Sequence, residues 1–91
     1  MGLDEDFQAA ADNISSKINK TMTDDELKEL YALYKQGSVG DINTARPGML
    51  DFKGKAKWDA WNGKKGMDQS KAKEEYITFS KKMMEKHGTR A

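Results

Sequence analysis

The chain has 91 residues, of which 36% are hydrophobic and 34% are charged, and this length leaves room for a single domain, residues 1–91, with one thin core. Its 16 Lys and Arg residues nearly balance its 15 Asp and Glu residues, for a formal net charge of +1, whereas nucleic-acid-binding domains typically carry a clear basic excess. The absence of cysteine excludes disulfides, thiolate metal sites and cysteine nucleophiles.

The first predicted element is a helix that begins near Asp4. Acidic residues occupy its first turn, where the helix dipole favours negative charge. Its apolar residues recur at helical spacing and are expected to form one buried stripe. The stripe consists of Phe7, Ala10, Ala11, Ile14 and Ile18.

A second helix is predicted to begin after Thr23, because the segment from Thr23 to Glu26 matches a capping box. Lys35 falls at the edge of its predicted apolar face, and Gly37 is expected to end the helix. The residues expected on the apolar face are Leu27, Leu30, Tyr31 and Tyr34.

A long loop, from Gly37 to about Asp51, is predicted to separate the second helix from the third. Loops of this length in small domains tend to be functional or tightly packed. The third helix is predicted to start near Asp51 or Phe52 and to end before Gly63. Its pattern is the least regular, because Trp58 and Trp61 fall on a different face from Phe52 and Ala56.

The fourth predicted helix has Asp68 as its N-cap and ends at Gly88. A second, narrower apolar stripe, made of Ile77 and Met84, suggests that this helix contacts two partners. No strand-like alternation competes with the four segments, so the predicted fold class is all-α. The main stripe of the fourth helix consists of Ala72, Tyr76, Phe79 and Met83.

No catalytic, metal or cofactor site is predicted. The carboxylates lie at expected helix starts or on polar faces, where capping and solvation explain them. The serines have no histidine partner except His87 near the C-terminus, so a nucleophile lacks its base. A single histidine also cannot by itself build a histidine-based metal site.

The lysines and tyrosines offer a binding chemistry. Lys53 and Lys57 are four residues apart, on one face if the segment is helical, and Lys35 lies one turn beyond Tyr31. Tyrosine rings stack on a base while ammonium groups pair with phosphates, which together suit a nucleotide. The alternative is a solvated lysine face with tyrosines at the edge of the core, and composition alone favours this alternative.

Three segments of the sequence favour the binding interpretation over the solvated lysine face. The runs Tyr31–Gln36, Val39–Thr44 and Arg46–Asn62 resemble the signature of the acyl-CoA-binding protein family. The resemblance is dense over residues 31–62 and extends over about residues 7–88. It implies a four-helix bundle of up-down-down-up topology whose ligand is long-chain fatty acyl-CoA.

The resemblance also implies which residues bind. One group corresponds to the family positions around the adenine and 3′-phosphate of CoA: Tyr31, Lys35, Lys57 and Tyr76, with Tyr34 close by. A second group corresponds to positions near the acyl chain and pantetheine: Leu27, Leu30, Lys53 and Ala56. A phosphate-contacting lysine of the first helix in the family falls on Ser15, so Lys17 or Lys20 is a candidate substitute and the contact stays unassigned.

The expected function is therefore that of a cytoplasmic, monomeric carrier of long-chain acyl-CoA. The carrier is expected to shield the thioester and to contact acyl-CoA-using enzymes transiently. Neither nucleic-acid binding nor stable membrane insertion is expected, since the charge is balanced and no apolar run reaches membrane length. The acidic N-terminus is not that of a signal peptide. The main alternative is a helical protein-interaction or signalling module without a small-molecule ligand.

Overall fold

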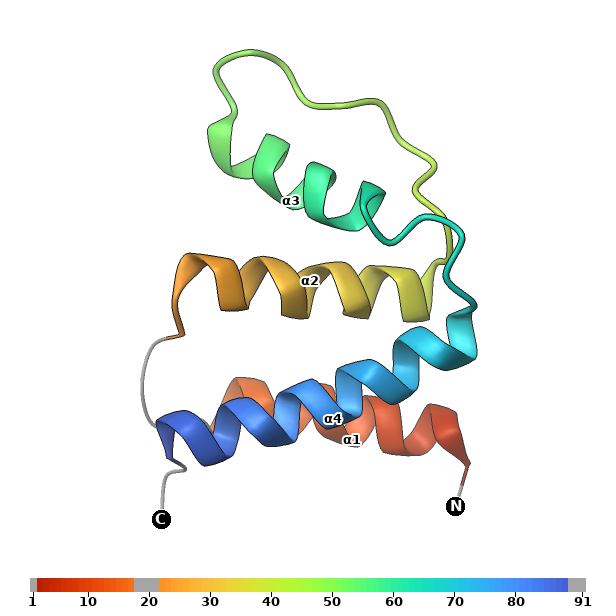
Figure 1. Ribbon diagram of the computed structural model, residues 1–91, viewed down its shortest axis with the longest axis vertical. Coiled ribbons are helices and arrows are strands. Elements are labelled where there is room, and N and C mark those ends of the chain that lie inside the picture. Colours follow the sequence, from red (N-terminus) through yellow and green to blue (C-terminus); the bar gives the residue numbers. More distant parts are fainter. Residues whose placement is uncertain (1, 18–21, 89–91) are drawn as a thin grey trace.

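Four α-helices make up the part of the chain that the computed structural model describes, residues 2–17 and 22–88, and that part contains no strand. The helices are α1 (Leu3–Lys17), α2 (Asp24–Ser38), α3 (Phe52–Asn62) and α4 (Gln69–His87). Figure 1 shows α1 and α4 running in one direction and α2 and α3 in the other. The predicted all-α fold with up-down-down-up topology is confirmed.

The helices are stacked unevenly. Helix α4 packs against both α1 and α2, whereas the extensive contacts of α3 are with α2. As a result α3 lies on the outer side of α2, and the molecule measures 41 × 29 × 15 Å (Figure 1). None of the four helices described is long and apolar enough to cross a membrane.

The core lies where α1, α2 and α4 meet. Most of the predicted stripe residues of α1 and α4 are buried there, and Ala11 and Phe79 are partly buried and pack against this core. Ile18 lies outside the described residues. On α2 the most buried residues are not those predicted: Leu33 and Gln36 are fully buried, whereas Leu27 is 43% exposed. The core cluster consists of Phe7, Ala10, Ile14, Leu30, Leu33, Tyr76 and Met83.

Three of the helices start at the predicted N-cap residues, whose side chains accept hydrogen bonds from backbone amides of the first turn. At α2, the Thr23 amide donates to Glu26 Oε1 at 2.9 Å, and the Glu26 amide donates to Thr23 Oγ1 at 3.2 Å. Asp51 accepts from the third residue of α3 at 2.9 Å, and Asp68 accepts from the Ser70 amide at 3.1 Å. These short-range contacts satisfy amides that have no partner inside their helix.

Gly37 does not end α2, so this prediction is wrong. It is buried inside the helix, which continues to Ser38. A Cβ atom at this position would lie 3.0 Å from Lys73 Cγ and 3.2 Å from Phe7 Cζ. The glycine therefore permits close packing of α1 and α4 on α2. The change of chain direction comes later, at Gly40, whose φ of 97° is accessible mainly to glycine.

The long segment between α2 and α3 is fastened to α3 by both tryptophans. Trp61 is buried and its Nε1 donates to the Gly40 carbonyl at 2.9 Å. Trp58 Nε1 donates to the Thr44 carbonyl at 2.8 Å. The two rings thus face the segment, while Phe52 on another face is 74% exposed. The predicted difference in orientation is confirmed, and these bonds fix the position of α3.

Candidate functional site

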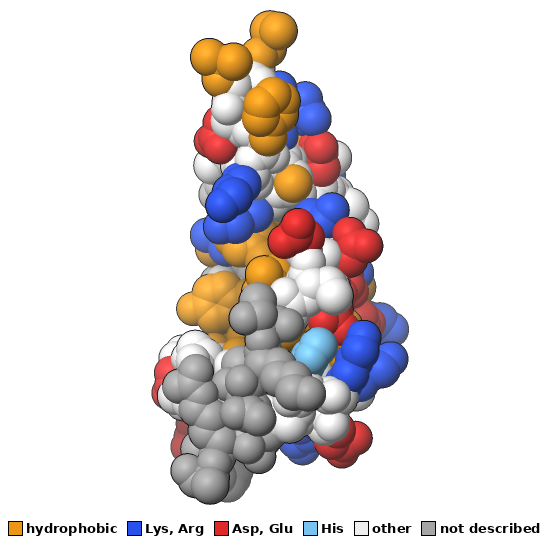
Figure 2. Space-filling model, turned by 90° about the vertical axis from the view of Figure 1, so that its left-hand side faces the viewer, with side chains coloured by type: hydrophobic (Ala, Val, Ile, Leu, Met, Phe, Trp, Pro, Cys, Tyr) orange, Lys and Arg blue, Asp and Glu red, His pale blue; other side chains and the backbone are white. Residues whose placement is uncertain are grey.

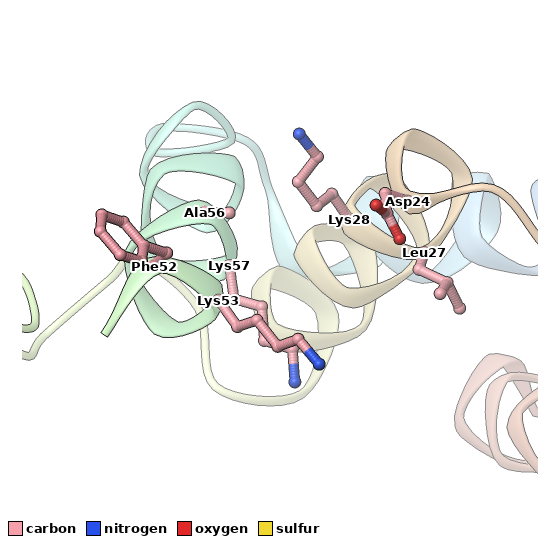
Figure 3. A pocket seen from close by; sticks show the side chains of 7 residues that line it. All are labelled: Asp24, Leu27, Lys28, Phe52, Lys53, Ala56 and Lys57. Atoms are coloured by element: carbon pink, nitrogen blue, oxygen red, sulfur yellow. The ribbon is translucent and has the colours of Figure 1, made fainter. Parts of the chain in front are cut away.

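A groove of about 410 Å³ lies between the first half of α2 and the first half of α3. Its lining combines apolar side chains with charged ones on both sides (Figure 3). Three lining residues come from α2 and four from α3: Asp24, Leu27 and Lys28, then Phe52, Lys53, Ala56 and Lys57. We call this the α2–α3 groove.

The two lysines of α3 reach the same side of the groove. Lys53 and Lys57 are four residues apart, so their side chains share one helix face, and Figure 3 shows them extending side by side. Lys28 extends to the opposite side of the groove, and its ammonium group lies 3.3 Å from Asp25. The groove therefore has a pair of neighbouring cations on one side only, next to the apolar side chains of Leu27 and Ala56.

Two cation–ring contacts connect α2 with α3. The Lys57 ammonium group lies 5.5 Å from the centroid of the Tyr31 ring, and the Lys35 ammonium group lies 5.0 Å from the centroid of the Trp61 ring. An ammonium group is attracted to the negative face of an aromatic ring at these distances. The contacts hold both lysine side chains over the interface of the two helices.

Tyr34 and Tyr76 belong to an aromatic cluster with Phe7. The Phe7 ring stacks on Tyr34 at 5.4 Å and meets Tyr76 edge-on at 5.1 Å, and the two tyrosine rings are 5.7 Å apart. Tyr76 is only 3% exposed. Burial, with smaller contributions from Tyr34 and Asp12, raises the pKa of Tyr76 from 10.0 to about 12. Its hydroxyl, like that of any tyrosine at neutral pH, is a potential hydrogen-bond donor.

Only some of the expected site residues lie at the α2–α3 groove. Leu27, Lys53, Ala56 and Lys57 line the groove together, and Tyr31 adjoins it through Lys57. Leu30, expected near the acyl chain, does not line the groove; it is 9% exposed and part of the core.

The first-helix contact stays unassigned. Ser15 is exposed, and its hydroxyl donates to the Ala11 carbonyl at 3.0 Å within its own helix. The side chain of Lys17 and all of Lys20 lie outside the described residues. Within the described ranges, no three His, Asp or Glu side chains come together to form a metal site.

Three groove residues were not predicted: Asp24, Lys28 and Phe52. Asp24 and Lys28 are one helical turn apart on either side of Leu27, and this spacing places all three near one face of α2. The spacing was available in the sequence, but Asp24 was explained by its favourable position at a helix start. Phe52 gave no such signal, because its place at the groove depends on how α3 packs on α2.

Known proteins are similar to this chain in sequence and fold. The family model described as "Acyl CoA binding protein" matches residues 4–80. The "Acyl-CoA-binding protein homolog" of Drosophila melanogaster is 53% identical over 83 residues, which are 91% of this chain and 95% of that protein.

Solved structures agree. The crystal structure of Oryza sativa Acyl-CoA-Binding Protein 2 is similar with a TM-score of 0.87 and 36% identity, covering 93% of each chain. The ACBP of Moniliophthora perniciosa has a TM-score of 0.85 and 34% identity, covering 99% of this chain and 87% of that one.

Proposed function

This chain belongs to the acyl-CoA-binding protein family, as its residues 31–62 indicated, and on that premise we propose that it binds long-chain fatty acyl-CoA esters at the α2–α3 groove. It carries the ester without changing it. A long-chain acyl-CoA has an anionic nucleotide at one end and an apolar chain at the other. Its site must therefore offer cations, a ring for the base and an apolar surface on neighbouring elements.

The observation that carries the proposal is the composition of the groove. Leu27 and Ala56 supply apolar surface, and the paired Lys53 and Lys57 supply positive charge directly beside it. The Tyr31 ring under Lys57 adds an aromatic surface at the same side. Phosphates pair with ammonium groups, and burial of the acyl chain contributes roughly 0.8 kcal/mol per methylene.

The proposed function includes no chemical step. Serine hydroxyls such as that of Ser80, which donates to the Ile77 carbonyl at 2.9 Å, are engaged with the backbone. The only histidine, His87, contacts Glu26. These contacts give no support to a serine–histidine pair that could attack the thioester, so we infer a carrier that shields its ligand without a cofactor.

The proposal extends to the setting in which the carrier works. We infer a cytoplasmic monomer whose 91 residues act as one domain, which maintains a pool of acyl-CoA and exchanges it transiently with enzymes that make or use the ester. The balanced charge of +1 supports a small-molecule ligand over nucleic acid.

Side-by-side calorimetric titration with palmitoyl-CoA, CoA and palmitate tests the proposal. Palmitoyl-CoA should bind at least about a hundredfold more tightly than either half, because only the ester engages both the cations and the apolar surface. Lengthening the chain by two carbons should tighten binding roughly tenfold until the groove is full. Equal affinities for palmitate and palmitoyl-CoA would disprove the assigned site, and no binding of any of the three would favour the interaction module.

A further inference from the structure

Asn62 and Gly63, at the end of α3, form the only Asn-Gly sequence in the chain. An asparagine that precedes glycine deamidates more readily than one that precedes any other residue, because glycine has no side chain to crowd its backbone nitrogen when that nitrogen attacks the asparagine. Both residues are exposed, so water reaches the side-chain amide. Asn62 is therefore a candidate for a spontaneous modification that the proposed function does not use.

Deamidation at this position needs only water as a co-reactant. The Gly63 nitrogen gives up its proton and attacks Cγ of Asn62, which closes a succinimide ring, and the side-chain amide nitrogen takes up a proton and leaves as ammonia. Water then opens the ring at either carbonyl group. The product is aspartate or isoaspartate, each with a new carboxylate, and in isoaspartate the main chain runs through the side chain and is longer by a methylene group.

The fold restrains the reacting nitrogen. The Gly63 amide donates to the Asp59 carbonyl at 3.0 Å, and Gly63 itself has helical backbone angles, with φ of −65° and ψ of −18°. Asn62 is the last residue of α3, and a helical backbone holds the next nitrogen away from the side-chain carbon that it must attack. The reaction therefore requires that the bond to Asp59 breaks and that the end of α3 leaves its helical conformation.

Two side chains that flank the Asn-Gly sequence anchor this end of α3. Trp61 is buried, and its Nε1 donates to the Gly40 carbonyl at 2.9 Å. The Lys64 ammonium group lies 2.8 Å from Glu29 of α2, so this ion pair joins the end of α3 to its neighbouring helix. Release of the end of α3 must break these contacts, and their strength should set how often the reactive conformation forms.

We propose that Asn62 is a site of spontaneous deamidation whose rate is set by release of the end of α3 from α2. The isoaspartate product has a longer main chain, which misaligns the bonds of this turn, including the one that the Lys65 amide donates to the Asn62 carbonyl at 3.1 Å. The modification thus converts a reversible opening of the helix end into a permanent loosening of α3.

The modified residue lies away from the α2–α3 groove. The groove is lined by the first half of α3, whereas Asn62 is the last residue of that helix. Figure 2 is viewed from the side on which α2 and α3 begin, where lysine and hydrophobic side chains gather. Deamidation would affect ligand binding through the position of α3, and a ligand that bridges α2 and α3 would protect Asn62. The free carrier would therefore be modified faster than the loaded one; this consequence rests on the proposed function.

Peptide mapping by mass spectrometry, after incubation of the full chain at mildly alkaline pH, measures the conversion of Asn62. The internal control is Asn43, which should stay intact because the branched side chain of Thr44 crowds the attacking nitrogen. In denaturing urea Asn62 should react at least about tenfold faster than in the folded protein, since the restraint of the fold is lost. Gly63→Ala should slow the reaction in urea, where only the local chemistry matters.

Glu29→Gln tests the link to α2 without changing the sequence around Asn62. Loss of the ion pair with Lys64 should speed the reaction about two- to fivefold in the folded protein, because a partly exposed pair contributes modestly to stability. The rate in urea should not change. Glu74→Gln, at an exposed position of α4, is the matched control and should react like the wild type.

Each outcome bears on a separate claim. The deamidation proposal is overturned if Asn62 in the folded protein stays intact as long as Asn43, if folded and unfolded chains react equally fast, or if Glu29→Gln reacts no faster than Glu74→Gln. Palmitoyl-CoA at a hundred times its dissociation constant should slow the reaction by up to about a hundredfold. An unchanged rate with palmitoyl-CoA bound would refute the protection by ligand, and a failure to bind palmitoyl-CoA would overturn only the proposed function.

Discussion

Lys35 and Lys57 have reciprocal positions: each ammonium group lies over an aromatic ring of the helix opposite, Trp61 of α3 or Tyr31 of α2. Lys35→Ala or Lys57→Ala should weaken acyl-CoA binding roughly ten- to hundredfold, since a hydrogen bond to a charged group contributes about 1.5–3 kcal/mol. The helices should persist, because alanine is a good helix former. Titration of each variant with palmitoyl-CoA and with its 3′-dephospho analogue measures both the affinity and the phosphate preference.

The control for these variants is Lys82→Ala, which removes an exposed lysine of α4. Lys64 is unsuitable as a control because its ammonium group lies 2.8 Å from Glu29, so its loss would break an ion pair to α2. If Lys35→Ala and Lys57→Ala bind palmitoyl-CoA as tightly as Lys82→Ala does, these lysines only solvate the surface and the site assignment fails.

Gly37 is the residue at which packing and helix propensity oppose each other. Gly37→Ala gains about 1 kcal/mol of helix propensity, but the new methyl group would lie 3.2 Å from Cζ of the buried Phe7 ring. That ring stacks on Tyr34 and has little room to move, and overpacking costs about 1–3 kcal/mol. The net expectation is a loss of about 1 kcal/mol in the free energy of unfolding, measured by urea denaturation. Gly48→Ala, with no atom within 4 Å of the added carbon, should change stability little; a Gly37→Ala protein as stable as wild type would refute the packing argument.

At the scale of elements, one carboxylate joins the start of α2 to the end of α4. Glu26 Oε1 accepts from the Thr23 amide at 2.9 Å and lies 2.8 Å from His87 Nε2, and Glu26 Oε2 pairs with Lys86. The hydrogen bond from Lys86, followed by that from Thr23, lowers the pKa of Glu26 from 4.5 to about 2. The charged form of Glu26 is therefore favoured in the folded state.

This shift predicts a pH dependence with a definite sign. Because the pKa of Glu26 is lower in the folded state, its contribution to stability is fully present above pH 4.5 and is lost as the pH falls towards about 2. Glu26→Gln retains a side-chain oxygen for the capping box but loses the charge. Wild type should be more stable than Glu26→Gln at neutral pH, and the difference should shrink across this range in denaturant titrations. A difference that stays constant with pH would contradict the assignment, and Glu85→Gln, at an exposed position of α4, serves as the control.

The helix starts could be predicted from the sequence because caps are local. Thr23, Asp51 and Asp68 each bond an amide two or three residues away. Burial on α2 could not be predicted in the same way. Gln36 is polar, yet it is fully buried because its amide donates to Asp41 at 2.9 Å and to the Met67 carbonyl at 2.8 Å. Both partners lie beyond the helix, so no helical periodicity indicates them.

In the candidate site, too, local features could be predicted from the sequence, whereas features that depend on packing could not. The four-residue spacing of Lys53 and Lys57 predicted a shared face, which the structure confirms. The spacing of Tyr31 and Lys35 also suggested nucleotide binding, whereas the choice of the remaining site residues came from the family resemblance. The roles of all these residues stay predictions. The places of Lys28 and Phe52 at the groove follow from the packing of α3 on α2, which no short segment encodes.

On the scale of the whole molecule, α3 is the helix that packs least against the other helices. Its extensive contacts are with α2, whereas α4 packs on two helices. Trp58 and Trp61 add hydrogen bonds to the segment before α3, which is itself largely exposed. Elements with few packed neighbours open at lower free energy than the core. Opening of α3 would also separate the two walls of the groove.

Hydrogen exchange therefore should distinguish the helices and respond to the ligand. Amides of α3 should exchange faster than those in the middle of α4 in the free protein. Palmitoyl-CoA at a hundred times its dissociation constant should slow exchange in α3 by about a hundredfold, since a ligand that bridges α2 and α3 binds only the closed state and adds about 2.7 kcal/mol to its stability. CoA alone should protect less at the same concentration. Amides near Leu3, at the start of α1 and outside the groove lining, provide the internal control and should not change. Unchanged exchange in α3 with saturating palmitoyl-CoA would show that the ester binds elsewhere, and the groove assignment would then be wrong even if the protein binds the ester tightly.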